Sequence, residues 1–124
     1  MKTIFVVDDS DTNLLMAEES LEDYYQVMTI PSAAKMFVFL EKFVPDVILL
    51  DIQMPEMDGF EALERLKANP TYADIPVIFL TGYMDDDVKA RSRELGAVDI
   101  ITKPFSASAL LERIEAHLPD KQAD

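Results

Sequence analysis

The sequence contains no cysteine, a single histidine and less than half as many basic as acidic residues, and each shortage excludes a class of function. Without cysteine the chain has no disulfide scaffold, no thiolate nucleophile and no cysteine-ligated metal. The 11 Lys and Arg against 24 Asp and Glu give a formal net charge of −13, which would repel a phosphate backbone. No basic stripe with interleaved aromatic residues offsets this charge, so we expect no direct nucleic-acid binding.

Long apolar runs and phosphate-binding loops are missing as well. No run approaches the roughly 20 apolar residues that cross a bilayer, and the start of the chain leads into a strand rather than into a signal peptide. We therefore expect no membrane association and a cytoplasmic location. There is no loop of the type Gly-x-x-x-x-Gly-Lys-Ser/Thr, so direct use of ATP is not expected. His117 falls near a helix end, where the helix dipole favours a surface cation over a catalytic group.

The 124 residues are within the usual size of one domain. We place this domain at residues 1–119 and expect a frayed polar tail at residues 120–124. Apolar strands alternate with segments of helical period. The expected strands lie near residues 4–7, 26–30, 47–50, 77–80 and 98–102. The expected helices cover roughly residues 12–23, 33–43, 59–69 and 85–95, and a last helix starts at Ser106.

Strands joined through helices must be parallel, with right-handed crossovers. The predicted fold is therefore α/β: a flavodoxin-like, doubly wound three-layer sandwich with a five-stranded parallel sheet of order 2-1-3-4-5 and five helices. In the first helix the expected apolar face is Leu14, Leu15, Ala17, Leu21 and Tyr24. In the second helix, Phe37 and Leu40 are expected to face the core, and a flanking stripe of Met36, Phe39 and Phe43 either packs against the third helix or forms an association surface.

Four of the apolar strands end in residues that can carry chemistry. Asp8 and Asp9 follow the first strand, Asp51 ends the third, Thr81 ends the fourth and Lys103 follows the fifth. In the predicted order, strands 1 and 3 are neighbours at the topological switch point, where such sheets bind ligands. Each residue alone has an ordinary explanation as a helix cap, turn hydroxyl or surface charge. Their joint placement predicts one site.

Three carboxylates that lie close together repel one another, and a divalent cation relieves that repulsion. Mg²⁺ fits best, because it accepts one or two carboxylates, keeps waters and leaves positions for phosphate oxygens; Mn²⁺ is a second option. Asp9 and Asp51 are expected to be direct ligands, Asp8 a ligand directly or through water, and the carbonyl of Gln53 a further one. A carboxylate can also attack phosphorus and form an acyl phosphate, with Thr81 and Lys103 as the donors that stabilise the transferred group.

These residues closely resemble the receiver domain of two-component response regulators, of the chemotaxis-regulator type, over essentially the whole chain. The shared motifs are Asp8-Asp9, Asp51 with Met54-Pro55-Glu56-Met57-Asp58-Gly59, Thr81-Gly82 and Lys103-Pro104-Phe105. The resemblance implies a phosphoacceptor at Asp51, a metal-binding pair at Asp8 and Asp9, a switch hydroxyl at Thr81 and a phosphate-contacting base at Lys103. It also implies a cis peptide bond before Pro104, which X-Pro bonds permit.

By this resemblance the chain is a signalling domain that takes a phosphoryl group from a sensor histidine kinase or a histidine phosphotransfer protein and then switches its binding of a downstream protein. It would catalyse its own phosphorylation and dephosphorylation without a turnover substrate. Receivers commonly carry Tyr or Phe three residues before the lysine, where this chain has Ile100, so we expect no aromatic rotamer readout. Because no effector segment follows the last helix, a stand-alone protein is favoured.

Two other functions share part of this pattern. Phosphohydrolases of the haloacid dehalogenase class also use an Asp nucleophile, Mg²⁺, a Thr or Ser and a Lys. They place a second Asp two residues after the nucleophile, where this chain has Gln53, and they carry a cap insertion that it lacks. A receiver-like protein that only binds partners is disfavoured by the complete acidic site. Gln53 and Tyr83 are expected beside the phosphoryl group, where they would tune the access of water to it.

Overall fold

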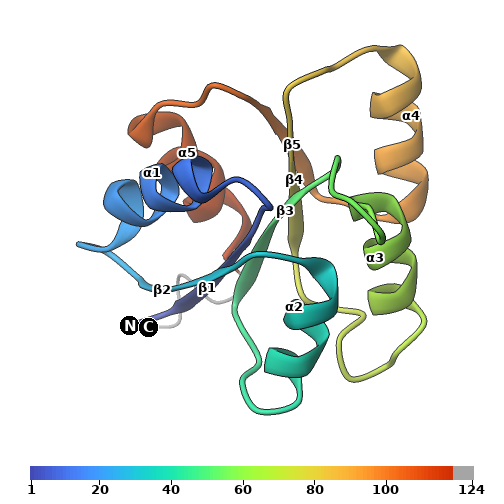
Figure 1. Cartoon of the computed structure of the whole chain (residues 1–124), viewed down its shortest axis with the longest axis horizontal. Coiled ribbons are helices and arrows are strands. Elements are labelled where there is room, and N and C mark those ends of the chain that lie inside the picture. Colours follow the sequence, from blue (N-terminus) through green and yellow to red (C-terminus); the bar gives the residue numbers. More distant parts are fainter. Residues whose placement is uncertain (119–124) are drawn as a thin grey trace.

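The computed structural model describes residues 1–118, which form a parallel sheet with helices on both of its faces (Figure 1). The tail expected at 120–124, and the end of the domain at residue 119, lie outside the described residues. Within residues 1–118 the elements follow in this order: β1 (Thr3–Val7), α1 (Asp11–Leu21), β2 (Gln26–Ile30), α2 (Ala33–Leu40), β3 (Val47–Asp51), α3 (Gly59–Lys67), β4 (Val77–Thr81), α4 (Asp86–Leu95), β5 (Asp99–Thr102) and α5 (Ala107–His117).

The strand order is β2-β1-β3-β4-β5 with every pair parallel, which confirms the predicted topology. Val7, the last residue of β1, pairs with Ile30 and Leu50, and Thr81 pairs with Thr102. All five residues of β3 and of β4 are buried. Because these strands run in the same direction, the residues that end or follow β1, β3, β4 and β5 share one edge of the sheet.

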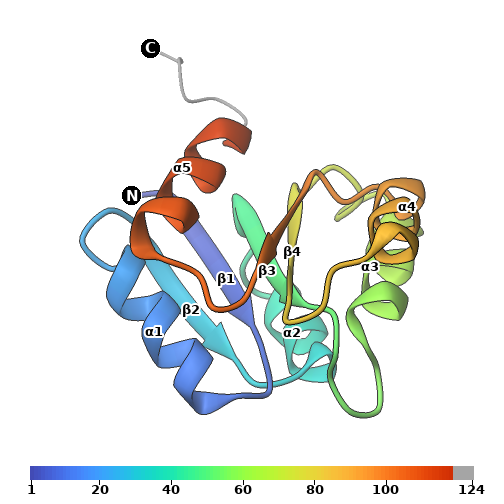
Figure 2. The same cartoon turned by 90° about the horizontal axis from the view of Figure 1, so that it is seen from above.

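The sheet separates two apolar cores because successive side chains of a strand point to opposite faces. Phe5 and Val7 lie in the core under α2, α3 and α4, whereas Ile4 and Val6 lie in the core under α1 and α5. Figure 1 shows α1 and α5 together on one side of the sheet and the other three helices on the opposite side, and Figure 2 shows the same layers from above.

The helices begin where the sequence places a short polar side chain before an amphipathic segment. In each case that side chain accepts a hydrogen bond from the backbone N–H three residues later, which satisfies one of the free donors of the first turn. The capping residues are Ser10, Ser32, Asp58, Asp85 and Ser106. Gly96 ends α4 with φ of 100°, the left-handed conformation expected of it.

The predicted face of α1 was too wide. Leu14, Ala17 and Leu21 are buried, but Leu15 and Tyr24 are more than half exposed. The helix ends at Leu21, so Tyr24 lies past it, and Leu15 is turned about 100° from Leu14 around the helix axis. Only a narrow stripe of α1 therefore faces the core, and the apolar pattern of the sequence predicted a wider face.

The prediction for the second helix was right for Leu40, but it placed Met36 outside the core face and the end of the helix too late. Met36 is fully buried together with Leu40, while Phe37 and Phe39 are only partly buried against the same core. The helix ends at Leu40, three residues early, and Phe43 is half exposed. Pro45 disfavours helical backbone only at the residue before it, so the apolar pattern did not mark the earlier end at Leu40.

None of the helices between residues 1 and 118 has the length and apolar character needed to cross a bilayer.

Candidate functional site

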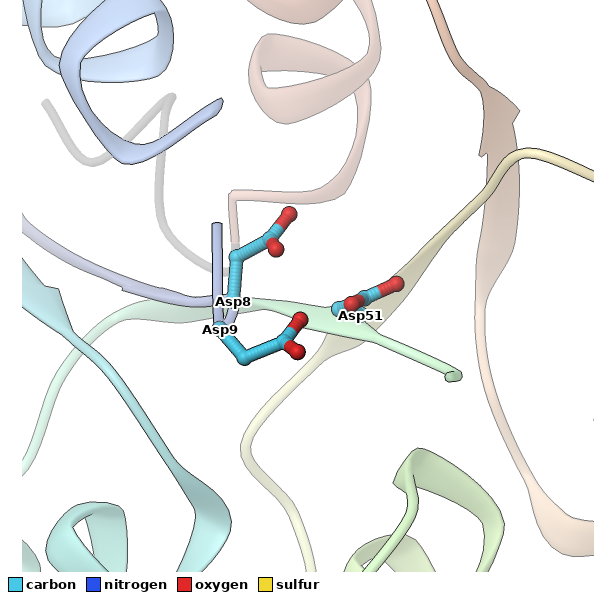
Figure 3. A group of neighbouring side chains, drawn as sticks. All are labelled: Asp8, Asp9 and Asp51. Carbon is cyan, nitrogen blue, oxygen red and sulfur yellow. The ribbon is translucent and has the colours of Figure 1, made fainter. Parts of the chain in front are cut away.

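The three predicted acids come together at the carboxyl edge of the sheet. Asp8 and Asp9 follow β1, Asp51 ends the neighbouring β3, and one oxygen from each carboxylate lies within 4.8 Å of the others (Figure 3). Asp8 and Asp51 are buried, whereas Asp9 is exposed. The expected convergence of Asp51 with two acids more than 40 positions earlier in the chain is therefore confirmed, and the cluster has one side open to solvent.

Backbone groups hold the two buried carboxylates. The N–H of Ser10 donates to Asp8 Oδ1 at 2.9 Å, and the N–H of Gln53 donates to Asp51 Oδ1 at 3.4 Å. Each carboxylate thus accepts a bond from the N–H two residues later, so the loops after β1 and β3 fold back over the strand ends. These bonds fix where the carboxylates point before any ligand arrives.

Gly59 lets α3 begin directly against the end of β3. Its N–H donates to the carbonyl oxygen of Ile52 at 2.8 Å. A Cβ atom added to Gly59 would lie 2.5 Å from the carbonyl oxygen of Asp51 and 2.8 Å from the Cα of Ile52, closer than real Cβ contacts. The site therefore requires glycine at this position for close approach, and the sequence indicated only that Asp58-Gly59 turns the chain into a helix.

Lys103 joins the acids from the fifth strand. Its Nζ lies 3.0 Å from Asp51 Oδ1 and 3.0 Å from Asp8 Oδ2. The N–H of Lys103 donates to the carbonyl of Thr81 at 2.8 Å, which keeps the start of the loop beside β4, and the bond between Lys103 and Pro104 is cis, as the resemblance implied. One ammonium therefore serves two buried carboxylates.

The electrostatic balance of the site makes Asp51 harder to ionise than an ordinary aspartate in the metal-free chain. Burial, followed by the negative charge of Asp8, raises the pKa of Asp51 to about 6, although the hydrogen bond and charge of Lys103 act in the opposite direction. Burial of Lys103 acts to lower its pKa, but contacts with Asp8 and Asp51 outweigh burial and the pKa of this ammonium lies above its ordinary value. The site thus carries more negative charge than its own cation balances.

The donor atoms suit a hard divalent cation. Asp8 Oδ2 is buried and, within residues 1–118, has no hydrogen-bond partner; the nearby Lys103 ammonium is an ionic neighbour without hydrogen-bond geometry. An oxygen-only donor set with one exposed carboxylate at Asp9 matches the preference of Mg²⁺ for few protein ligands and several waters. The ligand role of the Gln53 carbonyl stays a prediction.

Thr81 lies at the same edge but its hydroxyl is engaged elsewhere. The side chain is 1% exposed, and its Oγ1 donates to the carbonyl of Tyr83 at 2.8 Å and accepts from the N–H of Tyr83 at 3.1 Å. Thr81 must therefore release the backbone of its own loop before the hydroxyl can serve a group bound at Asp51. Gln53 and Tyr83 line a hollow of about 500 Å³ together with Thr81, which places them beside the site as expected.

Ile100 occupies the position at which the resemblance implies an aromatic residue. It pairs with Phe79 across β4 and β5 and is partly buried against the core under α2, α3 and α4. This branched side chain has no ring to move inward, and the absence of an aromatic rotamer readout stays a prediction.

Two groups of contacting side chains were missed by sequence reasoning. Arg91 of α4 lies over the ring of Phe60 at 4.4 Å. On β5, Asp99 contacts Arg113 at 2.5 Å and His117 Nε2 at 3.1 Å, so the single histidine packs against the sheet instead of serving only the helix end. The spacing of Arg113 and His117, four residues apart on one helix face, was a signal in the sequence for the cluster around Asp99. The sequence contains no comparable signal for the contact of Arg91 with Phe60.

Known proteins share this sequence and architecture. A family model for the response regulator receiver domain matches residues 4–115. A probable cyclic di-GMP phosphodiesterase of Vibrio cholerae is 40% identical over 98% of this chain, which spans 27% of that protein. Protein PilH of Pseudomonas aeruginosa is 34% identical, with 95% of this chain and 98% of PilH covered. The crystallised chemotaxis protein CheY4 of Vibrio cholerae is 29% identical with a TM-score of 0.91, covering 95% of this chain and 99% of CheY4.

The chain spans about a quarter of the length of the first curated relatives that it matches. The match to the family model nevertheless includes every strand described above and extends into α5. The acids, the hydroxyl and the lysine all lie within it. The chain belongs to the response regulator receiver domain family.

Proposed function

We propose that Asp51 is the phosphoacceptor of this phosphorylation-controlled signalling receiver. The observation that carries the proposal is the placement of a buried Asp51 carboxylate 3.0 Å from the ammonium of Lys103 and within a 4.8 Å cluster with Asp8 and Asp9. A buried acid with a cation on one side and further acids on the other suits phosphoryl transfer, which depends on positioning and charge stabilisation more than on an acid-base relay.

The transfer step needs only groups at this edge. A carboxylate oxygen of Asp51 attacks phosphorus, a new O–P bond forms, and the bond from phosphorus to the donor breaks, with its electron pair leaving on the donor. Lys103 stays beside the attacked group and donates to one of the phosphoryl oxygens, and the hydroxyl of Thr81 donates to another after it releases Tyr83. When bound by Asp8, Asp9, Asp51 and the Gln53 carbonyl, a magnesium ion would offset the charge of the acids and of the incoming phosphoryl group.

The donor in this proposal is a sensor histidine kinase or a histidine phosphotransfer protein, and the output is a change in affinity for a downstream protein. Phosphorylation shifts the population of two states only as far as the partner prefers one of them. Because Ile100 replaces the usual aromatic residue, movement of Thr81 and its loop would have to carry the readout. Donors of this kind draw on cellular ATP, which supports a cytoplasmic location.

We also propose that the domain hydrolyses its own acyl phosphate and has no separate turnover substrate. The Vibrio relative is named as a phosphodiesterase, but this chain spans only 27% of it, so that activity is not assigned here. The residue two positions after Asp51 is the exposed Gln53, which cannot supply the acid-base carboxylate of a haloacid dehalogenase. Membership of the receiver family therefore outweighs the phosphohydrolase alternative.

The test is phosphorylation of the purified chain with acetyl phosphate, with and without Mg²⁺, followed by intact-mass measurement. We expect the parent to gain one phosphoryl group when Mg²⁺ is present and Asp51→Asn to gain none. Asp46→Asn is a suitable control, because Asp46 precedes β3, at the opposite end of that strand from Asp51, and accepts a hydrogen bond from the N–H of Thr3. A parent that gains no phosphoryl group would favour a function by binding alone, and repeated turnover of small phosphate esters would favour the hydrolase.

A further inference from the structure

The hollow beside Thr81 has features that the transfer reaction described above does not use. It lies between the loop that follows β3 and the first turns of α4, and its volume is about 500 Å³. Gln53, Thr81 and Tyr83 line the side next to the phosphoacceptor, and Phe60 and Arg91 line the side formed by α3 and α4. A group attached to a phosphorus atom at Asp51 would therefore have space on this side of the site.

Arg91 is held in place at the wall of this hollow. Its guanidinium carbon lies 4.4 Å from the centroid of the Phe60 ring, a cation–π contact that orients a planar guanidinium without removing its charge. Phe60 in turn meets the buried ring of Phe79 edge to face, with centroids 5.5 Å apart. The core strand β4 thus supports the position of a charged side chain on the surface of α4.

Arg91 is also the one cation among the described residues that line the hollow. The neighbouring ammonium of Lys103 is committed to Asp8 and Asp51, and the protein as a whole carries a formal charge of −13. A roughly spherical hollow of this volume is about 10 Å across, close to the Debye length of about 8 Å at physiological ionic strength. Asp58 also lines the hollow, but its Oδ1 accepts a hydrogen bond from the N–H of Glu61 at the start of α3. The guanidinium of Arg91 is therefore the group that attracts a negative charge inside the hollow.

We propose that this hollow receives the leaving group of an acyl phosphate donor and that Arg91 is a specificity-determining residue for such donors. The inference rests on the proposed role of Asp51. During transfer, the bond between Asp51 and phosphorus forms, the bond between phosphorus and the acyl oxygen breaks, and its electron pair leaves on a carboxylate. Negative charge develops on that oxygen in the transition state, where the guanidinium of Arg91 stabilises it.

Donors with a P–N bond give a different result at the same residue. Phosphoramidate carries the proton on its nitrogen already and loses neutral ammonia, so no negative charge develops in the hollow. A cation at Arg91 then contributes nothing to the departure of the leaving group. Arg91 should therefore affect the rate of transfer from acyl phosphate donors and leave the rate of transfer from P–N donors unchanged.

The experiment compares the rate constants for phosphorylation by acetyl phosphate and by phosphoramidate in the parent, Arg91→Ala and Arg93→Ala. Arg93 is the matched control: it is an exposed arginine on the same helix, but it lines a different hollow. Because Arg91 is exposed, the loss should have the size of a screened charge interaction, about two- to fivefold. We expect this loss for Arg91→Ala with acetyl phosphate only, and none for Arg93→Ala.

The phosphoramidate rate also reports whether each variant is folded and competent. A similar loss with both donors, or the same loss in Arg93→Ala, would overturn the assignment to Arg91 and leave the role of Asp51 intact. A parent that takes no phosphoryl group from either donor would instead overturn the proposed function. Phe60→Leu adds a second variant, because it removes the supporting ring and keeps the charge, and it should show a smaller loss that is again confined to acetyl phosphate.

Discussion

The ammonium of Lys103 lies 3.0 Å from Asp51 Oδ1, although 52 positions separate the two residues in the chain. The same nitrogen lies 3.0 Å from Asp8 Oδ2, so a single cation stands between two carboxylates that are almost fully buried. Asp9 lies in the same cluster, so three acids face one base. Such an excess of carboxylates suits a divalent cation, which makes Lys103 and Asp51 the residues to test.

Replacing Lys103 with methionine should separate metal binding from phosphoryl transfer. Loss of the ammonium leaves the acids without their internal cation, so we expect Lys103→Met to bind Mg²⁺ more tightly than the parent does. The variant also loses the donor to the phosphoryl oxygens, so phosphorylation by acetyl phosphate should slow by on the order of 10²-fold. Titration with Mg²⁺ and the rate of mass gain measure the two effects.

Lys35→Met is the control for this pair of measurements, because Lys35 is exposed on α2 and its removal changes the net charge equally. Lys35→Met should change the Mg²⁺ affinity and the phosphorylation rate only as much as the loss of any surface charge would. Weaker Mg²⁺ binding in Lys103→Met would show that the lysine organises the acids instead of competing with the ion.

The stability of the metal-free chain should fall as the pH rises from 4 to 6 because of Asp51. Its folded-state pKa of about 6 lies above the ordinary value of 3.8, so the folded state binds this proton more tightly than the unfolded state does. The stabilisation is present below pH 3.8 and is lost as the pH rises through about 6. Asp51→Asn cannot ionise, so its free energy of unfolding should exceed that of the parent by a gap that widens over this interval and then levels.

Urea unfolding in EDTA at several pH values measures the gap. Asp46→Asn serves as the comparison, because Asp46 lies outside the acid cluster and accepts its hydrogen bond from the N–H of Thr3. A gap that stays constant from pH 4 to pH 7 would contradict the raised pKa of Asp51. Addition of Mg²⁺ should narrow the gap at pH 7, since the ion stabilises the ionised carboxylate.

Most of the site followed from strand order. The runs Ile4–Val7 and Val47–Leu50 read as strands buried on both faces, and the rule for parallel βαβ units makes these strands neighbours. The positions of Asp8, Asp9 and Asp51 then require no knowledge of side-chain packing, because each residue is fixed by the strand that it ends or follows.

The features that could not be predicted from the sequence depend mainly on how side chains and helices pack on one another. The contact of Arg91 with Phe60 joins α4 to α3, and neither helix contains a local pattern that encodes the other's position. The engagement of the Thr81 hydroxyl with Tyr83 is the choice of one rotamer among several. In α2, apolar residues continue past Leu40, where the helix ends, so the apolar pattern does not mark that end.

Two glycines near the site should respond differently to alanine. A Cβ on Gly59 would press against the backbone of Asp51 and Ile52, whereas a Cβ on Gly82 has nothing within 4 Å. We expect Gly59→Ala to lower the free energy of unfolding by about 1–3 kcal/mol and to slow phosphorylation, because the phosphoacceptor strand must shift. Gly82→Ala should stay within about 0.5 kcal/mol of the parent. Equal unfolding midpoints for the two variants in urea would show that the start of α3 moves without cost.

The lifetime of the phosphorylated state should depend on Gln53 and Tyr83. Both side chains are exposed at the hollow that Thr81 also lines, where they cover the path of water to an acyl phosphate on Asp51. We expect Gln53→Ala and Tyr83→Ala each to speed dephosphorylation several-fold with little change in stability, since exposed side chains contribute little to packing. The decay of the phosphorylated mass after removal of the donor gives the rate.

The matched controls for this measurement are an exposed tyrosine and an exposed glutamine that lie away from the hollow. Tyr24 is 61% exposed and Tyr83 is 60% exposed, and Gln26 is an exposed glutamine on β2; neither control residue lines the hollow. Tyr24→Ala and Gln26→Ala should therefore leave the decay rate unchanged. If all four variants decay at the parent's rate, water reaches the acyl phosphate by another route, and the rate would then have to be set by Thr81, Lys103 and the bound ion, which hold the phosphoryl oxygens themselves.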